Sequence, residues 1–115
     1  MNDKFKIARY VKDFIILLDD FLLNYPKKYF ELRNRLVNDS YTLLELVYKA
    51  NYQDLFNRKP IQIEALMKIN LLDFYLEESF KKKIISEKQC LKLSNRLLTI
   101  NKMLYKWMMD EKCED

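Results

Sequence analysis

The side chains best suited to chemistry in this chain are cations spaced along one stretch near its C-terminal end. A basic residue or a threonine recurs there every three or four positions, in the series Lys88, Lys92, Arg96, Thr99, Lys102 and Lys106. This spacing keeps the series on one face of an α-helix, opposite Leu97 and Leu104. Between residues 87 and 109, five basic residues stand against the single carboxylate of Glu87, a local excess that equals the net charge of the whole chain, +4. The pattern predicts either contacts to nucleic-acid phosphates or a solvated helix face.

A second basic cluster lies near the expected start of another helix. It consists of Lys27, Lys28, Arg33 and Arg35. Cations in the first turns of a helix interact unfavourably with the helix dipole. Their placement therefore indicates that another interaction, such as binding of a phosphate, offsets this cost. Glu31 and Asp39 are close in sequence, and a local network of salt bridges is the alternative explanation.

The composition argues against catalysis. The chain contains no glycine and no histidine, which removes glycine-rich phosphate loops, histidine general bases and histidine-ligated metals. Asp73, Glu77 and Glu78 resemble the inward carboxylates of di-iron bundles, but those sites also need histidine. Cys90 falls on an apolar helix seam, where a thiol is usually buried and unreactive. We therefore expect a protein that is not an enzyme and that has no catalytic residue, metal or cofactor.

Apolar residues recur every three or four positions through four segments, which predicts four amphipathic helices. We expect these helices at residues 4–23, 26–55, 60–83 and 86–109, with a polar patch at 38–40 on a continuous second helix. An acidic tail at 110–115 follows and is expected to fray. One domain of 115 residues with this pattern predicts an all-α, antiparallel up-down four-helix bundle.

Three local signals mark the expected helix starts. Pro26 and Pro60 each fit the first position of a helix, where the missing N–H costs nothing. Ser86 and Gln89 have the spacing of a capping box, in which each side chain bonds the backbone N–H of the other residue.

Nothing in the sequence indicates export or membrane insertion. The N-terminal residues lack the apolar core of a signal peptide, and no apolar run reaches the length of about 20 residues that spans a bilayer. Two cysteines, Cys90 and Cys113, are too few for a disulfide scaffold. We expect a soluble cytoplasmic protein.

The third expected helix is apolar around most of its circumference. A helix of this kind must be buried on more than one side, and the core of one four-helix chain covers one stripe only. We therefore expect a homo-oligomer that uses the outward residues of this helix. The expected interface residues are Ile63, Met67, Leu71, Phe74 and Tyr75.

Three segments of the chain carry a family resemblance. They are residues 25–29 (YPKKY), 43–51 (LLELVYKAN) and 97–107 (LLTINKMLYKW). In their order and spacing they resemble the Avd family, the accessory variability determinants of diversity-generating retroelements. That family is related to four-helix proteins encoded in intervening sequences of bacterial 23S rRNA genes.

The resemblance implies a four-helix protomer that assembles as a barrel-like homopentamer. It also implies binding to a retroelement reverse transcriptase and to RNA or DNA through basic surface, in support of mutagenic cDNA synthesis. Two alternatives stay open: a protein of the rRNA intervening-sequence type, and a purely structural oligomerisation module.

Overall fold

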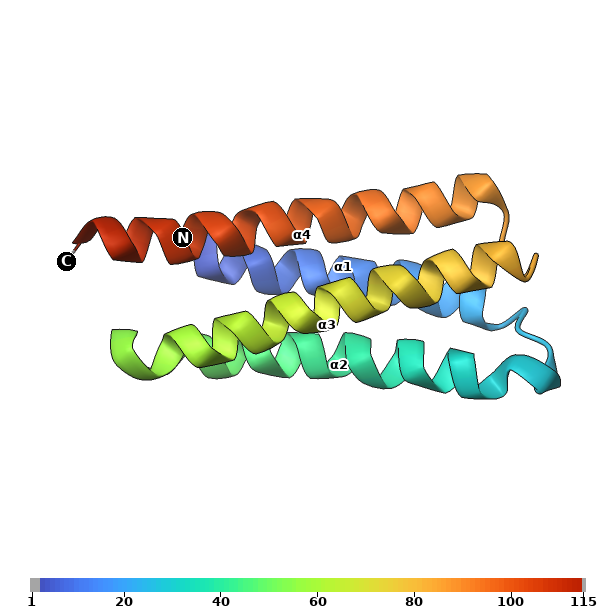
Figure 1. The fold of residues 1–115 in the computed structure, drawn as a ribbon, viewed down its shortest axis with the longest axis horizontal. Coiled ribbons are helices and arrows are strands. Elements are labelled where there is room, and N and C mark those ends of the chain that lie inside the picture. The colour runs from blue at the N-terminus through green and yellow to red at the C-terminus, as the bar shows by residue number, and fades with distance from the viewer. Residues whose placement is uncertain (1–2, 115) are drawn as a thin grey trace.

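The computed structural model describes the backbone of residues 3–114 and the side chains of residues 6–111. It contains the α-helices α1 (Asp3–Leu22), α2 (Phe30–Asn51), α3 (Leu55–Lys81) and α4 (Glu87–Glu114), and no strand within the described residues. Successive helices run in opposite directions, and α1 also packs against α4, which closes a bundle of 49 × 22 × 21 Å (Figure 1). The expectation of an all-α chain with four helices is confirmed.

The core is one column of mostly aliphatic side chains to which all four helices contribute. α1 and α4 bury residues at intervals of three and four, on the faces that the sequence pattern predicted. The fully buried members of the column include Ile7, Val11, Phe14, Leu36, Leu43, Leu72, Leu76, Leu93, Leu97, Ile100 and Leu104. Burial of this apolar area is the main favourable contribution to folding, and it fixes the faces that each helix presents to solvent.

The connection between α1 and α2 differs from the expected one. Pro26 has extended backbone angles (φ −62°, ψ 152°) and precedes a short 3-10 helix, η1 (Lys27–Tyr29), so it does not open α2 itself. The N–H of Tyr29 donates to the carbonyl of Pro26 at 2.9 Å. From Phe30, α2 continues through the polar patch at 38–40, as expected. The buried Ser40 hydroxyl is satisfied within the helix, since it donates to the carbonyl of Val37 at 2.8 Å.

α3 begins at Leu55, before the proline that was expected to start it. Asp54 caps this end, since its carboxylate accepts the backbone N–H of Asn57 at 2.9 Å and the side-chain amide of Asn57 at 3.1 Å. Pro60 then lies in the second turn, where it cannot donate to the carbonyl of Phe56. Both residues are exposed, so water can bond that carbonyl and the helix continues through the proline. The connection expected between residues 55 and 60 is therefore helical, and α2 ends at Asn51, before its expected end at residue 55.

Two local motifs connect α3 to α4. Lys83 lies in the left-handed region with φ 62°, and the N–H of Ile84 donates to the carbonyl of Ser79 at 2.9 Å, as in a Schellman cap. The capping box is confirmed: the N–H of Gln89 donates to Ser86 Oγ at 3.1 Å, and the N–H of Ser86 donates to Gln89 Oε1 at 2.9 Å.

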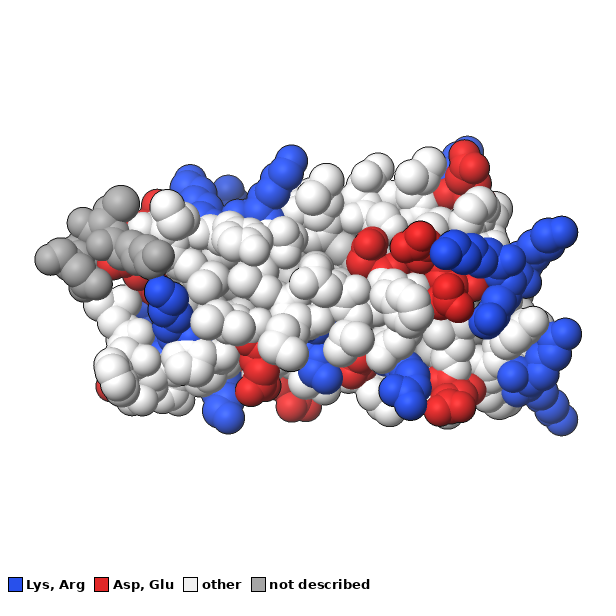
Figure 2. Space-filling view, in the orientation of Figure 1, with Lys and Arg blue, Asp and Glu red and all other residues white. Residues whose placement is uncertain are grey.

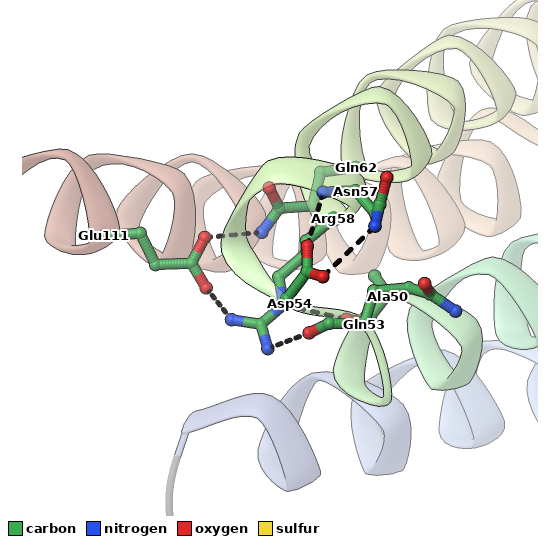
Figure 3. A network of polar contacts seen from close by, with 7 residues as sticks. All are labelled: Ala50, Gln53, Asp54, Asn57, Arg58, Gln62 and Glu111. Atoms are coloured by element: carbon green, nitrogen blue, oxygen red, sulfur yellow. Dashed lines mark hydrogen bonds and ion pairs between the residues drawn. The ribbon is translucent and has the colours of Figure 1, made fainter.

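α4 extends past residue 109 to Glu114, so the described part of the expected acidic tail is helical. A buried polar network holds this end (Figure 3). The Arg58 guanidinium forms an ion pair with Glu111, and the two side chains are 11% and 13% exposed. Gln62 Nε2 donates to the other carboxylate oxygen of Glu111 at 3.5 Å.

The same guanidinium also closes the turn between α2 and α3. Arg58 Nε donates to the carbonyl of Ala50 at 2.8 Å, and Nη2 donates to the carbonyl of Gln53 at 2.6 Å. Its central carbon lies 5.5 Å from the centre of the Trp107 ring, within the range of a cation–π contact. One side chain thus ties together α2, α3 and α4.

Candidate nucleic-acid and self-association surfaces

The expected cations of α4 form one exposed row, which we call the α4 basic row. It consists of Lys88, Lys92, Arg96, Lys102 and Lys106, all of them exposed. The apolar residues on the opposite side of α4, Leu97 and Leu104, are buried. The row therefore presents positive charge to solvent along most of a long helix, which is the arrangement needed to contact successive phosphates.

The groove between α1 and α4 adds residues that the sequence pattern did not single out. A hollow of about 250 Å³ is lined by Lys6 and Tyr10 of α1 together with Lys106 of α4. A neighbouring hollow of about 220 Å³ places Asp13 of α1 beside Arg96. Lys6 strengthens the positive charge near the C-terminal half of the row, whereas Asp13 weakens it at Arg96. Only the packing of α1 against α4 brings these residues together.

The second basic cluster is largely engaged in local contacts. Arg35 pairs with Glu31 at 3.2 Å, and Arg33 lies 5.4 Å from the centre of the Phe30 ring. The pair with Glu31 agrees with the expected local salt-bridge network, but Asp39 does not take part in it.

Asp39 pairs with another helix, and the two lysines of the cluster precede α2. Asp39 pairs at 3.2 Å with Lys68 of α3. Lys27 and Lys28 lie in η1, before the first turn of α2. Lys28 and Lys82 approach the ring of Tyr29 from separate segments, at 5.1 and 5.9 Å from its centre. Figure 2 shows the blue side chains gathered at this end of the bundle.

The outer side of α3 is a long apolar stripe, which we call the α3 face. Its members are Phe56 (89% exposed), Ile63 (46%), Met67 (57%), Leu71 (38%) and Phe74 (53%). Figure 2 shows a broad uncharged area along the middle of the bundle, where α3 faces the viewer. An exposed apolar surface of this extent is typical of an interaction site.

Tyr75 is a correction to the expected interface. It is 8% exposed and lies in the core. One residue after Phe74 the helix has rotated by about 100°, which turns Tyr75 toward α2. Together with Leu32, Leu71 and Phe74 it lines a hollow of about 540 Å³ between α2 and α3, bordered by Lys28, Arg35 and Lys82.

Glu77 and Glu78 form ion pairs with lysines, and the Cys90 thiol is partly buried. Glu77 and Glu78 pair with Lys81 and Lys82, each at 3.7 Å. In the part of the chain that the structure describes, no group of three or more metal-ligating side chains occurs. Burial raises the pKa of the Cys90 thiol, which disfavours the thiolate that a nucleophile requires.

Two further findings bear on function. None of the described helices has the length and apolar character needed to cross a membrane. Comparison with protein-family models, with curated proteins and with solved structures finds no match to this chain.

Proposed function

We propose that this chain is a non-enzymatic accessory protein of a diversity-generating retroelement. It binds RNA or DNA through the α4 basic row, binds the reverse transcriptase of the element, and assembles with copies of itself through the α3 face. It acts in the cytoplasm, where it supports mutagenic cDNA synthesis. The family resemblance would make the assembly a ring of five chains.

The observation that carries this proposal is the separation of two surfaces on one small bundle. The α4 basic row is exposed next to α1, whereas the α3 face is apolar and uncharged along its centre. A protein that scaffolds a polymerase on its template needs one surface for phosphates and another for protein. Self-association repeats the row in each subunit, which multiplies weak phosphate contacts into useful avidity.

Salt-dependent binding tests the nucleic-acid part. Each phosphate neutralised by a cation contributes about −0.7 to −0.9 to the slope of log affinity against log salt concentration. We expect the variant with Lys92, Arg96 and Lys102 all changed to Gln to bind labelled RNA or DNA more weakly and to lose about 2 to 3 from the magnitude of that slope. Fluorescence anisotropy over a salt series measures both quantities.

A matched control removes the same charge elsewhere. Changing Lys12, Lys49 and Lys81 to Gln lowers the net charge equally but leaves the row intact, so affinity and slope should change far less. Equal losses in the two triple variants, or no loss in either while the helical circular dichroism is retained, would show that the row is a solvated face. A reverse-transcriptase gene with template and variable repeats beside this gene supports the retroelement assignment, and an rRNA locus contradicts it.

A further inference from the structure

Tyr10 is an exposed aromatic residue that divides the groove between α1 and α4. It lines both hollows of this groove, and so does Thr99 on the opposite helix. α1 buries Ile7 and Val11 beside it, whereas Tyr10 itself is 37% exposed. The packing of two helices thus holds the ring in place, and part of its surface stays open to a ligand in either hollow.

Cations lie on both sides of this ring. Lys6 and Lys106 line the hollow on one side, and Arg96 lines the hollow on the other side together with Asp13. Lys6 and Asp13 are seven residues apart in α1, so the two hollows extend over about 10 Å of the bundle. Proteins that bind single strands combine such cations, which contact the backbone, with aromatic rings on which bases stack.

The carboxylate of Asp13 indicates that a base, and not a phosphate, occupies the hollow beside it. Among the described residues Asp13 has no ion pair, although Arg96 lines the same hollow. A carboxylate without a cation repels a phosphate, but it accepts the N–H groups that every base carries on its pairing edge. Asp13 follows Tyr10 by three residues, which makes the two side chains neighbours on the helix. In a duplex these N–H groups are already paired, so the site requires an unpaired base.

We propose that one unpaired base of a single-stranded nucleic acid stacks on Tyr10 and donates an N–H of its pairing edge to Asp13. Lys6 and Arg96 contact the phosphates on either side of this base. The inference rests on the nucleic-acid binding in the proposed function and specifies the form of nucleic acid that is bound. Assembly through the α3 face leaves the site open, because among the described helices α1 packs against α2 and α4 only (Figure 1).

Removal of the ring tests the stacking. Tyr10→Leu keeps an apolar side chain in the groove but lacks a flat ring. The dissociation constant for a labelled single-stranded oligonucleotide should rise about five-fold or more, as expected for the loss of one stacked base. The blunt duplex of the same sequence should be affected less than about two-fold, because its bases are paired and stacked on one another. The salt slope should stay the same, since no cation is removed.

Two control variants separate stacking from other effects. Tyr10→Phe keeps the ring and should bind the single strand as the unaltered protein does. Tyr41→Leu removes a tyrosine that is 47% exposed on α2, a helix that packs against α1 and α3, and it should change neither affinity. Equal weakening of the single strand and the duplex in Tyr10→Leu, or no weakening of either, overturns the site but leaves the α4 basic row as a phosphate surface. If the unaltered protein binds neither form, the proposed function and this site fail together.

Photochemical cross-linking tests the contact directly on the unaltered protein. A single-stranded oligonucleotide that carries 5-iodouracil in place of thymine becomes joined on irradiation to an aromatic ring against which the base stacks. Mass spectrometry of the digested complex should place the cross-link on Tyr10. A cross-link found only on other residues, or none at all, overturns the proposal. This measurement needs no variant, so it decides the question whether or not Tyr10→Leu folds.

Discussion

The two ends of the bundle are closed by different interactions. At the end where α2 turns into α3 and α4 finishes, Arg58 and Glu111 are buried together as an ion pair (Figure 3). At the other end, a neutral hydrogen bond of 2.6 Å joins the Tyr25 hydroxyl to Ser79 Oγ, and backbone caps complete the turns. A buried charge depends on its partner far more than a neutral group does. The comparison therefore predicts unequal responses of the two ends to mutation.

The largest effect is expected at the charged end. Arg58→Ala leaves Glu111 partly buried without a cation and removes the donor from the carbonyls of Ala50 and Gln53. The free energy of unfolding should fall by about 3–5 kcal/mol, as for other broken buried ion pairs. Urea unfolding followed by circular dichroism measures it.

A double-mutant cycle shows whether the loss belongs to the pair. Arg58→Ala combined with Glu111→Ala should cost less than the sum of the two single changes, because the double variant leaves no unpaired charge. A loss below about 1 kcal/mol for Arg58→Ala would place the pair among ordinary surface salt bridges and remove the contrast between the ends.

The same contrast separates what the sequence could predict from what it could not. Helix periodicity and the capping box of Ser86 and Gln89 depend on neighbours in sequence, and the structure confirms both. The partner of Arg58 lies 53 positions away in the chain, and no local pattern relates the two residues. Pro60 predicts a helix start at its own position, whereas the side chain of Asp54 caps the helix six residues earlier.

The candidate surfaces also combine features set by neighbours in sequence with features set by contacts between distant residues. The cations of the α4 basic row lie on one exposed side because helix geometry alone puts them there. Lys6 and Tyr10 join that surface through the packing of α1 on α4, which the pattern of either helix does not specify. The sequence does not show that Tyr75 faces inward, because a helix that is apolar nearly all round does not reveal which neighbour each side chain faces.

At the end closed by the Tyr25–Ser79 hydrogen bond, a substitution should stabilise the protein. Lys83 adopts φ 62°, a conformation that costs a residue with a Cβ about 1–2 kcal/mol and glycine almost nothing. Glycine also gains entropy in the unfolded chain, which offsets part of that difference. Lys83→Gly should therefore raise the free energy of unfolding by about 1 kcal/mol, measured by urea unfolding.

The adjacent lysine provides the control for this gain. Lys82 has φ −82°, which suits any residue, so Lys82→Gly should lower stability or leave it unchanged. A loss of stability in Lys83→Gly would show that the lysine side chain contributes more to the cap than its backbone strain costs.

The smallest effect concerns the titration of Tyr25. Burial raises the pKa of the Tyr25 phenol, although the hydrogen bond to Ser79 partly opposes this shift. In the unfolded chain the phenol ionises near its ordinary pKa of about 10. As the pH rises above about 10, the unfolded state loses this proton first, so the stability that Tyr25 contributes is complete below that pH and declines above it.

Tyr25→Phe lacks the proton and should be less stable by about 1 kcal/mol at neutral pH, because Ser79 loses its donor. The gap in free energy of unfolding between the two proteins should then narrow between pH 9 and pH 11, as measured by urea unfolding at each pH with about one unit between points. Titration of the other tyrosines and of the lysines is common to both proteins and cancels in the difference. If this difference in free energy of unfolding stays constant or widens over the range, Tyr25 ionises as readily in the bundle as in the unfolded chain. The end of the bundle around Tyr25 and Ser79 would then be open to water.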